Sequence, residues 1–135
     1  MKYTYNDVTV ILAELSAYRK SALLVRIDLE KQILQWKDYY QWNNNFVRSL
    51  SPDNVRLVRE KLPLTRLFQW EPGKKNDEVE LSDISRDTIW QITVMFSDGN
   101  SAKYAGEKIF PGQWAEFRNM IEEIARIPFK VRGWR

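Results

Sequence analysis

The stretch that decides the fold reads Trp90-Gln-Ile-Thr-Val-Met-Phe-Ser-Asp98-Gly99-Asn-Ser-Ala-Lys-Tyr104. Its large apolar side chains fall at every second position, which is the periodicity of a β-strand with one buried face. The more apolar of the two alternating sets comprises Trp90, Ile92, Val94 and Phe96. Asp98-Gly99 then supplies the positive φ that tight hairpin turns require. We therefore predict a β-hairpin whose second strand ends near Glu107.

Two amphipathic helices are predicted outside this hairpin. Ser51-Pro52-Asp53 has the residues of a helix start, and Pro63 is expected to end or kink that helix. Pro111 is expected to open the second helix, and Pro128 to close it. The apolar residues expected to face the core are Val55, Val58 and Leu62 in the first helix and Trp114, Phe117, Ile121 and Ile124 in the second.

The first forty residues contain further extended segments. Leu23, Val25, Ile27 and Leu29 share one face of a strand over residues 22–30, and residues 33–39 can pair with it after a reversal near residues 30–32. Residues 8–15 fit both a strand and a helix, because their apolar positions satisfy both periods. Their β-branched beginning favours the strand.

The order of these elements predicts an α+β fold. We expect an antiparallel sheet of about five strands with two helices packed on one face. Residues 1–135 are expected to form a single domain, since a chain of this length buries enough surface for one core without metals or disulfides.

Composition limits the chemistry available to this chain. It contains no His and no Cys, and therefore lacks the side chains that most often carry acid/base, nucleophilic and transition-metal chemistry. The formal net charge is +3 and the pI is about 9.2. This mildly favours acidic partners without matching the cation density of a dedicated nucleic-acid binder. We predict no cofactor, and the polar N-terminus without a long apolar run predicts a cytoplasmic protein with no membrane partner.

The C-terminal two thirds carry a recognisable pattern. The strand containing Trp90 that runs into Asp98-Gly99, the segment from Gly106 to Pro111, and the Trp114-Ala-Glu-Phe117 helix resemble small uncharacterised bacterial proteins. The helix-then-Trp stretch over residues 62–70 is similar to the same group. The resemblance implies an architecture and lends no activity.

Two arrangements of carboxylates were weighed as chemical sites. Asp77, Glu78, Glu80 and Asp83 could offer oxygen ligands to Ca²⁺ or Mg²⁺, but their spacing matches no EF-hand loop. We therefore predict a solvated segment and no metal site. Catalysis by two carboxylates needs no His, yet no pair of acids stands out, so no catalytic residue is predicted.

An aromatic cluster interleaved with cations is the best candidate surface. Trp36 and Phe46 are expected to fill the core. Tyr39, Tyr40 and Trp42 are harder to bury together, because successive strand residues point to opposite faces. With Arg48 they form the predicted partner surface. Core packing with incidental exposure is the first interpretation of this cluster as a whole, and a protein-partner or nucleic-acid surface is the alternative.

These observations predict a non-enzymatic protein that acts by protein–protein contact, through an exposed sheet edge or the Tyr39–Trp42 region. A weak single-stranded nucleic-acid binder that uses stacking and basic charge is the alternative, and a carboxylate-dependent enzyme is the second alternative. The tail over residues 129–135 either packs Phe129 or Trp134 onto the body or serves as an interaction tag. Partner identity and oligomeric state stay open.

Overall fold

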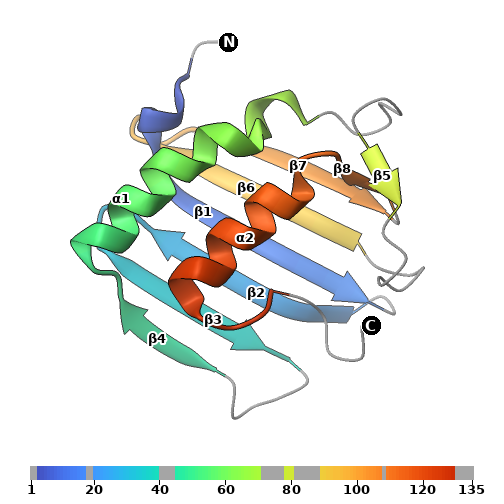
Figure 1. The fold of residues 1–135 in the computed structure, drawn as a ribbon, viewed down its shortest axis with the longest axis horizontal. Helices are drawn as coiled ribbons and strands as arrows, with labels where there is room; N and C mark the ends of the chain where they lie inside the picture. The colour runs from blue at the N-terminus through green and yellow to red at the C-terminus, as the bar shows by residue number, and fades with distance from the viewer. Residues whose placement is uncertain are drawn as a thin grey trace.

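The computed structural model describes residues 3–17, 20–39, 45–70, 78–80, 89–107 and 109–129. Its main sheet is fully antiparallel and has six strands, in the spatial order β4 (Phe46–Ser49), β3 (Ile33–Asp38), β2 (Lys20–Asp28), β1 (Val8–Ala17), β6 (Ile89–Phe96) and β7 (Ser101–Glu107). Helices α1 (Pro52–Lys61) and α2 (Trp114–Ala125) lie on the same face of this sheet (Figure 1). The predicted α+β fold is confirmed.

The remaining elements are short. A two-stranded sheet pairs β5 (Glu78–Glu80) with β8 (Ile109–Pro111). Three 3-10 turns, η1 (Tyr5–Asp7), η3 (Leu62–Thr65) and η4 (Leu67–Gln69), lie before β1 and after α1.

The first strand of the chain occupies the middle of the sheet. β1 pairs with β2 on one side and with β6 on the other, so that Ala13 lies opposite Val25 and Ile92. All three of these side chains are fully buried. The strand alternative for residues 8–15 is therefore the one observed, and β1 joins the N-terminal strands to the C-terminal hairpin.

The C-terminal hairpin has the predicted geometry. Trp90, Ile92, Val94 and Phe96 are all buried on the helix side of the sheet. Gly99 has a φ of 90°, and the Asp98 carboxylate accepts a hydrogen bond from the backbone N–H of Asn100 at 3.0 Å. Asp98-Gly99 thus closes the hairpin in the way that the sequence indicates.

Two details differ from the expectation. The main sheet has six strands, one more than the expected number of about five, because β4 was not predicted: it has four residues, too few for a period of two to be recognised. Pro111 does not open a helix but ends β8, and α2 begins at Trp114. A proline suits the end of a short strand as well as a first helical turn, because both positions can dispense with its N–H.

Helix α1 begins and ends where its sequence indicates. The Ser51 hydroxyl accepts a hydrogen bond from the backbone N–H of Asn54 at 3.1 Å. The helix ends at Lys61, and Pro63 is the second residue of the η3 turn that follows it. Val58 and Leu62 are fully buried. Arg59 also ties the helix to the start of β1, since its Nη1 donates to the carbonyl oxygen of Val8 at 2.7 Å.

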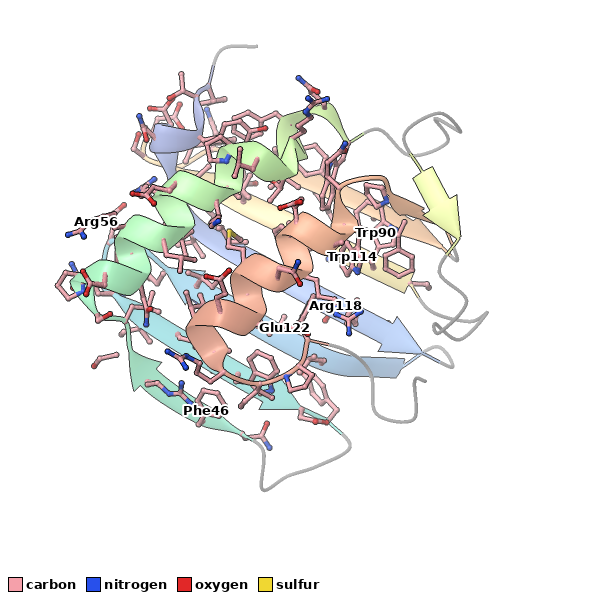
Figure 2. All side chains as sticks on the ribbon, in the orientation of Figure 1. Phe46, Arg56, Trp90, Trp114, Arg118 and Glu122 are labelled. Atoms are coloured by element: carbon pink, nitrogen blue, oxygen red, sulfur yellow. The ribbon has the colours of Figure 1, made fainter. Side chains whose placement is uncertain are left out.

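Aromatic side chains hold α2 against the sheet. The Trp90 and Trp114 rings lie side by side at the start of the helix (Figure 2), and their centroids are 6.0 Å apart. Trp70 packs edge-on against Trp90 at 5.6 Å, and Phe110 packs against Trp114 at 4.7 Å. The indole N–H of Trp114 is buried without an acceptor among the described residues. Packing, and not hydrogen bonding, therefore fixes this ring.

The chain after α2 folds back onto the core. Arg126 adopts a left-handed conformation with φ 61°, and Phe129 is fully buried against Trp36 and Trp114. The backbone N–H of Phe129 donates to the Glu122 carboxylate at 2.7 Å. The packed alternative for the tail is confirmed at Phe129, whereas residues 130–135, Trp134 among them, lie outside the described residues.

Gly106 provides a test of this packing. A Cβ atom at this position of β7 would lie 2.7 Å from Trp90 Nε1, and the Trp90 ring is held by its aromatic neighbours. We expect Gly106→Ala to lower the free energy of unfolding by about 1–3 kcal/mol. The measurement is denaturant-induced unfolding followed by Trp fluorescence. The control Ser101→Ala, at an exposed site in the same strand, should stay within about 0.5 kcal/mol of wild type, and equal stability of both variants would contradict the packing.

Candidate protein-binding surface

The two faces of the main sheet differ in what covers them. Both α-helices lie on one face, and among the described residues no helix lies on the other (Figure 1). We call this other side the uncovered face. Because strand side chains alternate between faces, it presents the residues that lie between the core positions of each strand.

Five apolar residues of the uncovered face form what we call the apolar stripe. It consists of Val10 and Leu12 on β1, Leu24 on β2, Ile33 on β3 and Met95 on β6. In the strand register Val10 lies opposite Met95, and the buried Asp28 separates Val10 from Ile33. Leu12 lies opposite Arg26 and Thr93, and Leu24 lies opposite Glu14 and Lys37, so polar side chains alternate with the apolar ones. None of the five belongs to the core beneath the helices, but Val10 is itself buried, with 6% exposed. Antiparallel sheets with one face in water usually carry polar residues there, so this stripe calls for a functional explanation.

Charged side chains border the stripe. Lys37 on β3 and Lys103 on β7 are exposed. They lie four strands apart, which is about 19 Å at ~4.8 Å per strand. The buried Asp28 carboxylate accepts the backbone N–H groups of Glu30 and Lys31 and lies 3.7 Å from the Arg26 guanidinium. Glu14 on β1, opposite Leu24, adds a half-buried carboxylate to this face, so the exposed charges that the described side chains offer there are those of Lys37 and Lys103.

The four residues of the predicted partner surface do not all fall together. Tyr40 and Trp42 lie outside the described residues. Tyr39 follows β3 and is 49% exposed, and the Lys37 ammonium lies 5.7 Å from its ring centroid. Lys37 alternates with the buried Trp36 and so belongs to the uncovered face, beside Tyr39. The structure thus places Tyr39 at the border of the apolar stripe.

Arg48 points to the opposite side of the sheet. It pairs with the buried Leu34, and its Nη1 donates to the carbonyl oxygen of Ala125 at the end of α2 at 3.1 Å. Its guanidinium also lies 4.5 Å from the ring centroid of Phe46. A cation at a helix C-terminus is favoured by the helix dipole. Arg48 therefore holds β4 to α2 and is separated from Tyr39 by the sheet itself.

Titratable groups on the helix side serve packing. Burial, together with the neighbouring Tyr5 phenol, raises the pKa of Tyr104 above its usual value. Tyr104 lies opposite Ile92 and belongs to the core, so it remains a neutral phenol at physiological pH. Glu122 accepts from Arg118 Nε at 3.1 Å as well as from the Phe129 N–H, which gives this carboxylate a structural role (Figure 2).

The acidic segment expected to lack a metal site is described only in part. Asp77 and Asp83 lie outside the described residues, and of Glu78 and Glu80 only the backbone, in β5, is described. Within the part of the chain whose placement is described, no group of three or more acidic side chains could hold a metal ion.

The apolar stripe was not predicted, although one sequence signal points to it. In residues 8–15 both alternating sets are rich in apolar residues, with Ile11, Ala13 and Leu15 in one and Val10 and Leu12 in the other. A strand that is apolar on both sides is typical of a sheet covered on both faces. The same feature makes this segment fit a helix and a strand equally well.

No family model matches the chain, and no curated protein matches it. The resemblance to small bacterial proteins therefore stays a prediction. None of the described helices is both long and apolar enough to cross a membrane.

The different positions of Arg48 and Lys37 lead to different effects on stability. We expect Arg48→Ala to lower the free energy of unfolding by about 1 kcal/mol, because the hydrogen bond to the end of α2 is lost from an exposed site. Lys37→Ala should change it by less than about 0.5 kcal/mol. Thermal and urea unfolding of both variants measure this, and equal effects would show that Arg48 does not anchor β4.

Proposed function

We propose that this protein acts by binding another protein through the uncovered face. The supporting observation is the apolar stripe of Val10, Leu12, Leu24, Ile33 and Met95 on a sheet face that no described helix covers. Interfaces of this kind have an apolar centre and a polar rim. Since the rim offers Lys37 and Lys103, the partner has an apolar patch bordered by acidic groups about 20 Å apart.

The size of the face suits a specific complex. Six strands at ~4.8 Å spacing and about seven residues at ~3.4 Å rise give an area of roughly 700 Å². A standard protein–protein interface buries ~800 Å² on each partner. A partner that covers this face and a little of its border would therefore make an interface of ordinary size.

The same features favour a protein over a nucleic acid. A nucleic-acid site needs a dense track of cations along the phosphate backbone. Here apolar side chains lie near the middle of the face, and the exposed lysines that the structure describes on it, Lys37 and Lys103, stand at opposite sides of the stripe. The arrangement is also non-enzymatic, because it brings aliphatic side chains together in place of reactive ones.

Site-specific photo-cross-linking tests the proposal. A benzophenone amino acid placed at Gln35, on the uncovered face, should cross-link one protein in the native cells. The same residue at Glu123, exposed on α2, should not. Equal capture at both positions, or none at Gln35, would contradict the proposed surface.

Charge reversal then tests how the captured protein is held. Lys37→Glu together with Lys103→Glu should weaken its binding to the purified chain at least tenfold in calorimetric titration. The control Arg56→Glu changes an exposed cation on α1 and should leave the affinity within about twofold. Unchanged affinity in the double variant would be contrary to the proposal, as would micromolar, steeply salt-dependent binding of a single-stranded oligonucleotide.

A further inference from the structure

The open edge of β4 has a defined hydrogen-bonding pattern. The backbone N–H of Leu50 donates to the carbonyl oxygen of Gln32 at 2.8 Å, in register with the β3–β4 pairs. Along an antiparallel strand the backbone N–H and C=O groups of successive residues point to opposite sides, so those of Phe46 and Arg48 point toward β3. Val47 and Ser49 turn theirs away, toward the side where no described strand pairs with β4. Four backbone groups are thus available for another strand.

β4 has some of the features that protect edge strands and lacks others. Edge strands are commonly protected by shortness, by charged side chains, by proline or by a bulge. β4 is four residues long and carries Arg48, but its register is regular and it contains no proline. Its outward position on the uncovered face is Val47, which is 67% exposed, more than any other large apolar side chain that the structure describes. Val47 is a β-branched residue of the kind that cross-strand pairs favour.

We propose that an extended segment of the protein partner adds to β4 as a seventh strand, with an acidic residue opposite Arg48. This inference rests on the proposed function, because Val47 lies beside Gln35 and so joins the edge to the uncovered face. Main-chain hydrogen bonds to Val47 and Ser49 hold the segment. Opposite charges on facing residues stabilise such a pair, and like charges destabilise it.

The charge of Arg48 disfavours one of the ways in which β4 could pair with a second copy of this chain. A two-fold axis at Val47 would place Arg48 opposite Phe46 without such repulsion, whereas an axis at Arg48 would place Val47 opposite Ser49 and Arg48 opposite Arg48 of the other copy. In that arrangement the two arginines form a non-hydrogen-bonded pair, whose Cα atoms are only ~4.5 Å apart. A segment with a carboxylate at this position meets the guanidinium favourably instead.

The probe for this proposal is the blocked peptide acetyl-Thr-Val-Glu-Val-Thr-amide, added to the ¹⁵N-labelled full chain. We expect chemical-shift changes and slowed hydrogen exchange at the backbone amides of Val47 and Ser49, with millimolar affinity. A peptide with Lys in place of Glu should bind about fivefold more weakly. No change at these two amides with ~2 mM peptide would overturn the proposal.

Two variants of Val47 separate backbone pairing from side-chain contact. Val47→Pro removes an N–H that points away from β3 and leaves the β3–β4 ladder intact, so it should abolish peptide binding while the rest of the amide spectrum is retained. Val47→Thr keeps that N–H and should bind within about twofold of wild type. Equal binding by both variants would overturn strand addition. Self-association of the wild-type chain that Val47→Pro removes would overturn it as well, in favour of a second copy.

The two proposals can fail separately. If the cross-linked protein responds to Lys37→Glu and Lys103→Glu but not to Val47→Pro, the face is the binding surface and the edge is not used. If Gln35 captures nothing while the peptide still binds at Val47 and Ser49, the proposed function fails at the face and the edge alone accepts a strand.

Discussion

The structure depends on the packing of α2 against the middle of the sheet through large aromatic rings. Trp114 contacts Trp90, Phe110 and Phe129, and all four side chains are almost completely buried. These rings come from the hairpin, the short strand before α2, the helix itself and the segment after it, so their contact draws these parts into one core. The contact also decides which set of alternating strand residues faces the helices, and therefore which set is left on the other side.

That second set gives the molecule its candidate function. β1 is central and apolar on both sides, and the helices cover only one of them. The stripe of Val10, Leu12, Leu24, Ile33 and Met95 is a consequence of this asymmetry. At one border of the sheet it meets Tyr39, Lys37 and the open edge of β4, so apolar area, positive charge and free backbone groups adjoin one another. A protein partner can use all three.

Local signals predicted most of the fold, and contacts between distant residues determined the rest. Asp98-Gly99 and Ser51-Pro52 act within a few residues, so the sequence indicates the hairpin and the start of α1 directly. β4 has four residues and exists because it pairs with β3, which no local pattern shows. The candidate site was harder to predict, because residues that are grouped by type and by nearness in the sequence can lie on opposite faces of the sheet. Tyr39 borders the uncovered face, whereas Arg48 turns toward the end of α2. The two apolar sets of residues 8–15 hint at the apolar stripe, but its position follows from the pairing of β1 with β2 and β6.

Thiol labelling of single-cysteine variants tests this account most directly, and the chain contains no natural cysteine to interfere. Leu12→Cys and Leu24→Cys lie on the uncovered face, while the adjacent Ala13→Cys and Val25→Cys lie beneath the helices. In the folded protein we expect the first pair to react with a maleimide on the order of a hundredfold faster than the second, because the buried thiols need an opening of the core. Similar reaction rates at all four positions would show that both faces are equally covered and would contradict the account.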